Sequence, residues 1–342
     1  MKGALPIEIV GGGLAGLSLG IALRRAGIDV TVFEAGDYPR HRVCGEFIAG
    51  LDEATMASLG LTPYLADARA HTSLTWFANN RAAGSSQLPE PAWGISRYAL
   101  DQRLAEGFVQ AGGTLLVNKR MDLDDSRPGR VVAAGRRRTR STWIGLKAHI
   151  AHLDTRSDLE LHLVPGAYVG LSGVEGGHCN VCGLFRRRAE EKQEEGRIPL
   201  EHYLRAYGFD QLSERVARAQ WIKSSATAVA GFSFASPAQS PSELAIGDAY
   251  AMIPPFTGNG MAMAFQSAAV TIKPLISWSK GELPWLEVVR RVRHDLRQRF
   301  GARLFFARTL HRFLHVSVFQ ACFTRANRHR LLPFQTLYRA LH

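Results

Sequence analysis

The stretch LPIEIVGGGLAGLSLGIALRRAGIDVTVFE, residues 5–34, decides the fold of this chain. Residues 5–10 are apolar and predict a strand, and residues 14–26 carry leucines among small residues and predict a helix. Residues 28–33 predict a second strand, which Glu34 closes. A strand, a helix and a strand in this order form a βαβ unit, so the sequence predicts a parallel sheet.

The turn between the first strand and the helix has the pattern G-x-G-x-x-G. Gly11 allows the tight turn, Gly13 lets a pyrophosphate approach the backbone, and Gly16 lets helix and strand pack closely. The helix start at Leu14 and Ala15 supplies free N–H groups and partial positive charge for phosphates. We therefore predict a dinucleotide site at this turn.

An acidic residue at the end of the second strand supports the same prediction. Glu34 stands 18 residues after Gly16, where a carboxylate can accept hydrogen bonds from the adenosine ribose. Ala35 follows it and is placed in the same site. An acid at this position disfavours a 2′-phosphate, so NADPH is not the expected ligand of this loop. The loop alone does not distinguish FAD from NAD.

A second block, LAIGDAYAMIPPFTGNGMAMA at residues 244–264, favours FAD. A strand ends just before Asp248, a proline-rich turn through Pro255 follows, and residues 258–261 begin a helix. Asp248 is suited to binding a polyol chain. The amides from Gly258 to Met261 are suited to facing a flavin pyrimidine edge, where the helix dipole stabilises an anionic reduced ring.

With a third block, RYALDQRL at residues 97–104, the chain resembles an FAD-dependent superfamily. This superfamily includes para-hydroxybenzoate-hydroxylase-type monooxygenases, geranylgeranyl reductases and flavin-dependent halogenases. The resemblance covers most of the chain to about residue 275 and implies an FAD-dependent oxidoreductase. The residues that it implies around the cofactor are Arg40 or Arg42, Arg97, Asp248 at the ribityl chain, and Gly258, Asn259 and Gly260 along the isoalloxazine.

Two candidate catalytic residues come from the same resemblance. Residues 39–46, PRHRVCGE, resemble the reductase segment that brings a Cys-Gly pair beside the flavin. Cys44 would then shape the pocket or assist proton transfer; the alternative is a small residue packed under the ring. Tyr168 remains from a reductase substrate-strand motif whose Trp and Phe-Pro are missing here. The Trp-x-Trp-x-Ile-Pro motif of the halogenases is also absent.

Two enzymatic functions follow from these residues. Our leading expectation is a monooxygenase that hydroxylates or epoxidises a small hydrophobic or aromatic metabolite through a flavin C4a-hydroperoxide. The alternative is a reductase or dehydrogenase that transfers hydride at a carbon–carbon bond, with Cys44, Tyr168, His149 or His152 as the proton partner. The sequence carries no second G-x-G-x-x-G, so electrons are expected from transiently bound NAD(P)H, a ferredoxin-like donor or a separate reductase.

The net charge of +12 is concentrated at the C-terminal end. From residue 290 onward there are twelve arginines and one acid, Asp295. Residues 302–323 mix phenylalanines and leucines with arginines, as in a basic helix that lies on an anionic membrane. The alternative is a helical cap over the substrate pocket. Nucleic acid is not an expected partner, because no binding motif is present.

The N-terminus shows no signal peptide and no segment has the length of a membrane span, so we expect a cytoplasmic protein, with peripheral membrane contact as the alternative. The four cysteines are too few for a disulfide scaffold. Cys179 and Cys182 form a CxxC in an apolar run, which we interpret as two buried side chains, with zinc or redox chemistry as alternatives. No metal is predicted.

The predicted fold class is α/β: a Rossmann-type FAD-binding domain, an antiparallel β-sheet substrate domain and C-terminal helices. Antiparallel strands are expected at residues 71–78, 147–153 and 159–163, where polarity alternates along the chain. The predicted domains are a discontinuous FAD-binding domain of residues 1–65, 95–145 and 240–275, a substrate domain of residues 66–94 and 146–239, and a helical segment of residues 276–342.

Overall fold

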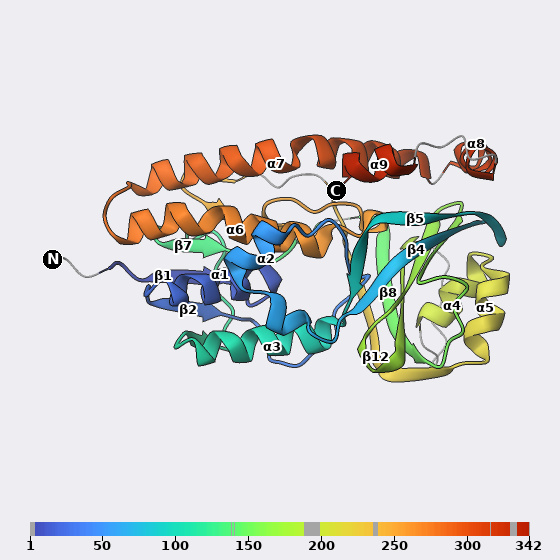
Figure 1. The fold of residues 1–342 in the computed structure, drawn as a ribbon, viewed down its shortest axis with the longest axis horizontal. Helices are drawn as coiled ribbons and strands as arrows, with labels where there is room; N and C mark the ends of the chain where they lie inside the picture. Colours follow the sequence, from blue (N-terminus) through green and yellow to red (C-terminus); the bar gives the residue numbers. More distant parts are fainter. Residues whose placement is uncertain are drawn as a thin grey trace.

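The computed structural model describes residues 4–137, 139, 141–187, 199–234, 239–314, 316–328 and 334–341. Two β-sheets organise this part of the chain, and a long C-terminal helix lies along one side of both (Figure 1). The predicted fold class is confirmed: a parallel Rossmann-type sheet, a second sheet and C-terminal helices are all present.

The first sheet is parallel and has the strand order β13-β7-β1-β2-β6. Its strands span, in that order, Leu244–Ala245, Arg130–Val132, Ile7–Val10, Val30–Phe33 and Thr114–Leu116. The central strand β1 buries Ile7 and Ile9 completely, as expected for a strand covered on both faces. The last strand along the chain, β13, pairs with β7, so the C-terminal half completes a sheet begun by the N-terminus.

Helices pack closely around this sheet. The glycine-rich turn leads into α1 (Leu14–Arg25), which is buried along most of its length because it contacts both α3 (Arg97–Gln110) and α6 (Gly260–Ser279). A Cβ atom on Gly20 would lie 2.8 Å from the Phe108 ring, which shows how near α3 approaches α1. The remaining short elements of this half are α2 (Glu53–Leu59) and the 3-10 turns η1 (Thr62–Leu65), η3 (Gly247–Ala249) and η4 (Pro255–Thr257).

The second sheet has the strand order β12-β8-β11-β10-β9-β4-β5-β3. Its strands span, in that order, Gln220–Ala230, Trp143–Ala151, His178–Arg186, Ala167–Gly173, Leu159–Val164, Arg69–Ala78, Arg81–Gly94 and Phe47–Ile48. The prediction of a wholly antiparallel sheet is wrong at one pair, because β4 and β9 run parallel. Parallel neighbours need a long crossover, and here the chain passes through the first sheet between them.

The two faces of the second sheet differ in polarity. Along β8, Leu146, Ala148 and Ile150 join an apolar core with α4 (Pro199–Ala206) and α5 (Asp210–Ala217), two helices that the sequence analysis did not predict. The alternate residues Lys147 and His149 point to the opposite face, where they contact Glu46 and are also buried. The polar face of the sheet therefore meets the first sheet's domain.

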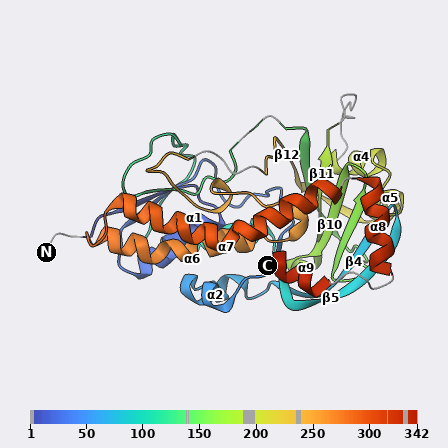
Figure 2. The same ribbon diagram turned by 90° about the horizontal axis from the view of Figure 1, so that it is seen from above.

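The C-terminal helices are α7 (Trp285–Leu314), α8 (Ser317–Arg328) and α9 (Phe334–Leu341). With 30 residues, α7 extends from the half built on the first sheet across to the second sheet, as both views show (Figure 2). Its buried residues recur every three or four positions, from Trp285 to Phe300, and pack into the first core. In the described ranges, no helix has the length and hydropathy needed to cross a bilayer.

A pair of substitutions tests whether α7 packs into the core around the first sheet. Phe300 is 1% exposed and Leu286, on the same helix, is 64% exposed. We expect Phe300→Ala to lower the free energy of unfolding by about 3–5 kcal/mol, because it leaves a cavity. Leu286→Ala should change it by less than about 0.5 kcal/mol. Chemical denaturation measures both, and equal effects would show that α7 does not pack as described.

Candidate active site

The three glycines of the N-terminal turn meet different surroundings. Gly11 has φ +112°, and a Cβ atom on it would lie 2.3 Å from the carbonyl oxygen of Ala133, which directly follows β7. A Cβ atom on Gly16 would lie 2.0 Å from the Gly11 oxygen. On Gly13 the nearest atom would be Arg97 Nη2 at 3.9 Å, so space is left there. Gly13 is the N-cap of α1 and no described side chain caps this helix, so its first N–H groups are available to a ligand.

Glu34 lies buried at the end of β2, beside the glycine turn. Its carboxylate accepts hydrogen bonds from the Gly12 N–H at 2.8 Å and the Gly36 N–H at 3.0 Å, and Arg40 Nη2 donates to it at 2.5 Å. Burial opposes ionisation, but the guanidinium groups of Arg42 and Arg40 lower the pKa of Glu34. Glu34 is therefore an anion that orders the turn and the arginine segment after β2.

Arg42 and Arg97 converge on one buried carboxylate, that of Asp101. Arg97 binds it through two hydrogen bonds of 2.7 and 2.8 Å, and Arg42 Nε donates to it at 2.9 Å. Burial alone would lower the pKa of Arg97, and the ion pair with Asp101 raises it. Arg42 Nη2 is buried without a hydrogen-bond acceptor in the described chain and lies 3.7 Å from a Glu34 oxygen. This donor is oriented for a further acceptor.

Asp248 follows β13 in η3 and belongs to the same electrostatic neighbourhood. Burial raises its pKa to about 6, although Arg97 and Arg136 oppose the rise. The charge of Arg97 thus lowers the pKa of Asp248, and Arg97 also lies next to Gly13. Gly13 stands 235 positions before Asp248 in the chain. The fold brings together the two ends of the predicted cofactor site.

The turn before α6 carries the remaining predicted cofactor residues. Pro255 lies in η4, Gly258 has φ +73° with Phe47 next to it, and Met261 is buried in the first turn of α6. Apart from its chain neighbours and the backbone of α6, no described heavy atom lies within 4 Å of a Cβ atom built on Gly260, which leaves this helix start open. Asn259, predicted to line the isoalloxazine, donates from Nδ2 to the carbonyl oxygen of Leu341 in α9. The C-terminal helix α9 therefore contacts this turn.

The predicted catalytic residue Cys44 lies in a loop fixed to the second sheet. Asn180 donates to the Cys44 carbonyl at 3.0 Å, and Ser172 donates to the Gly45 carbonyl at 2.8 Å. The Cys44 sulfur accepts the Glu46 N–H at 3.4 Å. Burial raises the pKa of the Cys44 thiol, and the positive charge of Arg97 only partly offsets this. At neutral pH Cys44 is a thiol that can donate a proton, and it is not a thiolate nucleophile.

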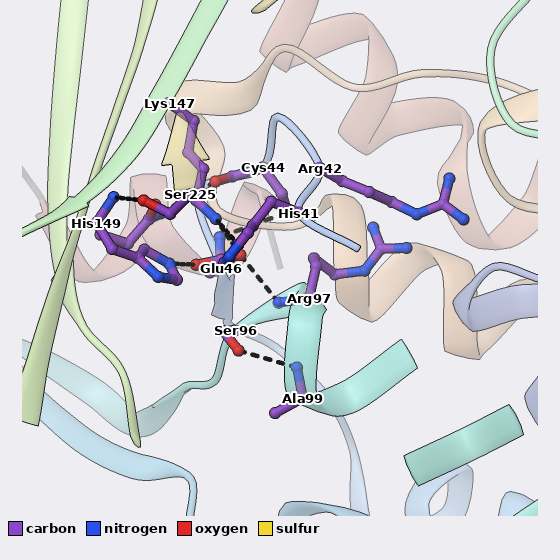
Figure 3. Close-up of polar contacts among 12 residues, drawn as sticks. His41, Arg42, Cys44, Glu46, Ser96, Arg97, Ala99, Lys147, His149 and Ser225 are labelled. Atoms are coloured by element: carbon purple, nitrogen blue, oxygen red, sulfur yellow. Dashed lines mark hydrogen bonds and ion pairs between the residues drawn. The ribbon is translucent and has the colours of Figure 1, made fainter. Parts of the chain in front are cut away.

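Beside Cys44 lies a buried ionic cluster centred on Glu46 (Figure 3). Lys147 Nζ lies 2.9 Å from one Glu46 oxygen and His149 Nε2 lies 2.5 Å from the other. The Arg97 N–H also donates to Glu46 at 2.9 Å, and Lys147 Nζ donates to His41 Nδ1 at 3.2 Å. Glu46 and Lys147 have fully buried side chains, and Glu46 has φ +53°, an unusual conformation for a non-glycine residue.

The protonation states in this cluster follow from its charges. Burial opposes ionisation of Glu46, but hydrogen bonding to His149 and the charge of Lys147 lower its pKa. Burial, together with Lys147 and His149, lowers the pKa of His41 to about 4, so its imidazole is neutral and accepts from the ammonium group. The cluster is therefore a carboxylate paired with a lysine and a histidine between the two halves of the molecule. Removing one partner from such a pair leaves a buried charge uncompensated.

Tyr168, the second predicted catalytic residue, lies in an apolar cluster against which Val43, the neighbour of Cys44, also packs. It is buried on β10 with Phe232, Met252 and Leu314, and its ring meets the Phe256 ring edge-on at 6.2 Å. Burial raises the pKa of Tyr168, so the phenol keeps its proton at neutral pH. Aromatic rings and aliphatic chains thus form a wall between η4, the second sheet and the end of α7.

The CxxC pair does not form a joint site. Residues three apart on a strand point to opposite faces, and Cys179 belongs to the core under α4 and α5 while Cys182 faces the Cys44 side. Burial raises the pKa of Cys179 to about 12. Within the residues that the structure describes, no group of three potential ligands suits a metal ion. His152 is exposed after β8, away from the cluster, whereas His149 is inside it.

Glu46 and Lys147 were missed by the sequence analysis. One signal was present: Lys147 and His149 occupy alternate positions between apolar residues of a strand whose other face is core. Their partner Glu46 stands 101 positions before Lys147 and follows the Cys44-Gly45 pair directly. No local pattern connects residues at such a distance, and only the paired sheets bring them together.

Two comparisons of the sequence with known proteins match parts of the chain. Residues 9–44 match the family model of the NAD(P)-binding Rossmann-like domain. The menaquinone reductase of Mycobacterium tuberculosis is 29% identical over 115 residues, which cover 32% of this chain. The match spans only 28% of the length of that relative.

Solved structures resemble almost the whole chain. HpxO of Klebsiella pneumoniae, complexed with FAD and uric acid, has a TM-score of 0.77 at 15% identity and covers 99% of this chain and 98% of its own. A geranylgeranyl bacteriochlorophyll reductase-like protein of Thermoplasma acidophilum has a TM-score of 0.75 at 15% identity, with 99% and 96% covered. PqsL of Pseudomonas aeruginosa, a probable FAD-dependent monooxygenase, has a TM-score of 0.71 at 14% identity, with 94% and 99% covered. The resemblance drawn from the sequence is confirmed at the level of the fold, which this chain shares with these three structures.

The glycine turn generates a paired stability prediction. We expect Gly16→Ala to lower the free energy of unfolding by about 1–3 kcal/mol, because the new methyl group meets the Gly11 backbone at 2.0 Å. Gly13→Ala should cost at least ~1 kcal/mol less, since the position is open. Urea titration of both variants measures the difference. Equal losses would contradict the space described at Gly13.

Asp248 generates a pH prediction for the ligand-free protein. Its pKa in the folded state, about 6, lies above the ordinary value of 3.8, so its contribution to stability is present at low pH and is lost as the pH rises through about 6. Between about pH 4 and pH 7, the urea midpoint of the wild type should therefore fall relative to that of Asp248→Asn. Parallel midpoints for the two proteins across this range would show that Asp248 is not buried as described.

Proposed function

We propose that this protein is an FAD-dependent oxidoreductase whose cofactor diphosphate lies over Gly13. The observation that carries the proposal is the convergence of four features at that point. They are the uncapped start of α1, the open space at Gly13, the unsatisfied donor of Arg42, and Arg97 with Asp248 beside it. A phosphate group would accept from the N–H groups and from Arg42, so these residues fit FAD.

The other cofactor residues have roles that agree with this placement. Glu34 is ionised and suited to bind the adenosine ribose, for which Arg40 would have to release one carboxylate oxygen. Asp248 would accept from the ribityl hydroxyls, and the open start of α6 at Gly260 would face the isoalloxazine edge. Bound FAD would supply the hydride and electron transfer that protein side chains lack.

The leading reaction that we propose is monooxygenation of a small hydrophobic or aromatic metabolite. The support is the apolar wall around Tyr168, which includes Phe256 and Phe232 and would exclude water from a bound substrate. Cys44 and Tyr168 keep their protons at neutral pH, so both would act as donors to a substrate and neither as a general base. Glu46, Lys147 and His149 would hold the Cys44 loop at a fixed position relative to this wall.

A carbon–carbon double-bond reductase is the second candidate. It is favoured by the partial match to a menaquinone reductase and by the protonated state of Cys44. In such a reaction a hydride adds to one carbon of the double bond and a proton to the other, and the Cys44 thiol would supply that proton. In either reaction the electrons would come from transiently bound NAD(P)H or from a separate reductase, because the sequence carries one G-x-G-x-x-G pattern.

The proposal is tested by purifying the protein, recording its visible spectrum and following NADH and NADPH oxidation with and without O₂. We expect a yellow protein with a flavin spectrum. Oxygen uptake that matches NAD(P)H oxidation in the presence of an aromatic substrate would support the monooxygenase. Oxygen-independent loss of a double bond would support the reductase. A colourless protein that does not take up FAD would overturn both.

Two glycine variants make the cofactor test specific to the site. Gly13→Ala should weaken FAD binding about tenfold or more, because its methyl group occupies the space for the diphosphate. Gly301→Ala, at an exposed position of α7 with nothing within 4 Å, is the matched control and should bind FAD as the wild type does. Fluorescence quenching of added FAD measures both affinities. Unchanged binding by Gly13→Ala would place the diphosphate elsewhere.

A further inference from the structure

Large apolar side chains gather on the solvent side of the C-terminal half of α7 and the start of α8. Among the described residues, those with the highest exposure in this region are Phe305 at 65%, Phe306 at 51%, Phe313 at 49%, Val316 at 47% and Val318 at 72%. The spacing places Phe305, Phe306 and Phe313 on one face of α7, Val316 follows the end of that helix, and Val318 lies in α8. We call these five residues the apolar stripe. Contiguous exposed apolar side chains of this kind mark an interaction surface.

A basic groove runs beside the apolar stripe. It has a volume of about 470 Å³, and arginines at three positions of α7 line it: Arg297, Arg308 and Arg312. Tyr250, from the segment after Asp248, forms part of its other wall. The guanidinium groups of Arg297 and Arg308 are near enough to lower the pKa of Tyr250, although burial raises it overall. The groove therefore presents cationic donors next to apolar rings.

Arginines outnumber carboxylates toward this end of α7, where Asp52 forms an ion pair with Arg299. After Asp295 the sequence contains no aspartate or glutamate, while arginines continue to position 339. The start of the same helix is different, because Glu287 forms ion pairs with Arg290 and Arg291 there. The excess of arginines over acids in the sequence of α7 thus lies toward the apolar stripe and not at the start of the helix. Charge complementarity calls for an anionic partner that also accepts phenylalanine side chains.

We propose that the apolar stripe and the basic groove dock this protein on an anionic lipid bilayer. The phenylalanines would enter the boundary between headgroups and acyl chains, and the arginines would bind lipid phosphates. Nucleic acid fits less well, since its phosphates would leave the five apolar side chains in water. The helices α7 and α8 lie on one outer side of the molecule, so they can reach a flat surface together (Figures 1 and 2).

The inner side of the same helix segment meets the apolar wall around Tyr168. Leu310 and Leu314 pack in that cluster, and the His311 ring lies 6.3 Å from Phe256 and 6.4 Å from Tyr168. The apolar stripe and the proposed substrate wall therefore lie on opposite sides of the same segment of α7. If the proposed function holds, this arrangement implies that the substrate enters from the bilayer side. The substrate would then be a lipid-soluble compound. The docking itself does not depend on the flavin.

The test is co-sedimentation of the full chain with vesicles of phosphatidylcholine alone or mixed with phosphatidylglycerol. We expect binding to the mixed vesicles, weakened by added salt, and little binding to phosphatidylcholine alone. Arg297→Gln with Arg312→Gln should weaken binding roughly thirtyfold, from about a factor of five for each arginine near an anionic surface. Phe305→Gln with Phe306→Gln should weaken it about tenfold or more.

Matched controls come from the start of α7. Arg290→Gln with Arg291→Gln removes the same charge, and Leu286→Gln removes an equally exposed apolar side chain. Both controls should bind the mixed vesicles within about twofold of the wild type. Absence of binding to the mixed vesicles, or equal losses in controls and stripe variants, would overturn the proposal. A dimer in sedimentation that Phe305→Gln with Phe306→Gln dissociates would also overturn it, because the stripe would then be covered by a second copy.

Flavin content separates the two proposals. If the protein binds FAD but not vesicles, only the membrane proposal is overturned. If it binds vesicles but not FAD, only the oxidoreductase proposal is overturned. The stripe and groove variants change exposed residues, so their unfolding midpoints should equal that of the wild type. If a double variant unfolds at a different midpoint, the single substitutions Phe305→Gln and Arg312→Gln take its place. Each of them should still weaken vesicle binding, by a smaller factor than the double variant.

Discussion

A single buried carboxylate, that of Glu46, sets the geometry between the two halves of this molecule. It is held by Lys147 and His149 from the second sheet and by the backbone N–H of Arg97 from the nucleotide-binding half. Ions buried this deeply are stable only with every partner in place. The loop that carries Arg42 and Cys44 therefore has one position, and both the proposed diphosphate site and the wall around Tyr168 are defined relative to it.

Much of the nucleotide-binding half was predictable, because short segments of sequence encode it. The glycine turn, α1 and Glu34 occur within 24 residues, and the structure places them as expected from local backbone rules. The strand before Asp248 was also identified by pattern. Alternating polarity located β4, β8 and β9 in the second sheet, since each has one face in the core beneath or beside it.

The rest depended on interactions between distant segments. The parallel pairing of β4 with β9 follows from a crossover through the first sheet, which no local pattern records. The short helices α4 and α5 are covered by the apolar face of β8, and this packing stabilises them because helices of eight residues are marginal on their own. Lys147 was assigned only to a strand, because its partner Glu46 lies about a hundred positions away. Cys44 and Tyr168 came from resemblance, and only burial reveals that both keep their protons.

The strand order of the first sheet has a consequence for how the chain is made. β1, β2, β6 and β7 emerge early from a ribosome, but β13, Asp248 and α6 follow only after the whole second sheet has been synthesised. Until then β7 has an open edge and the apolar surface of α1 lacks α6. A nascent chain of some 240 residues thus carries the glycine turn but lacks Asp248 and the start of α6. The proposed cofactor would therefore bind only late in synthesis, and the incomplete sheet stays exposed until β13 and α6 have been made.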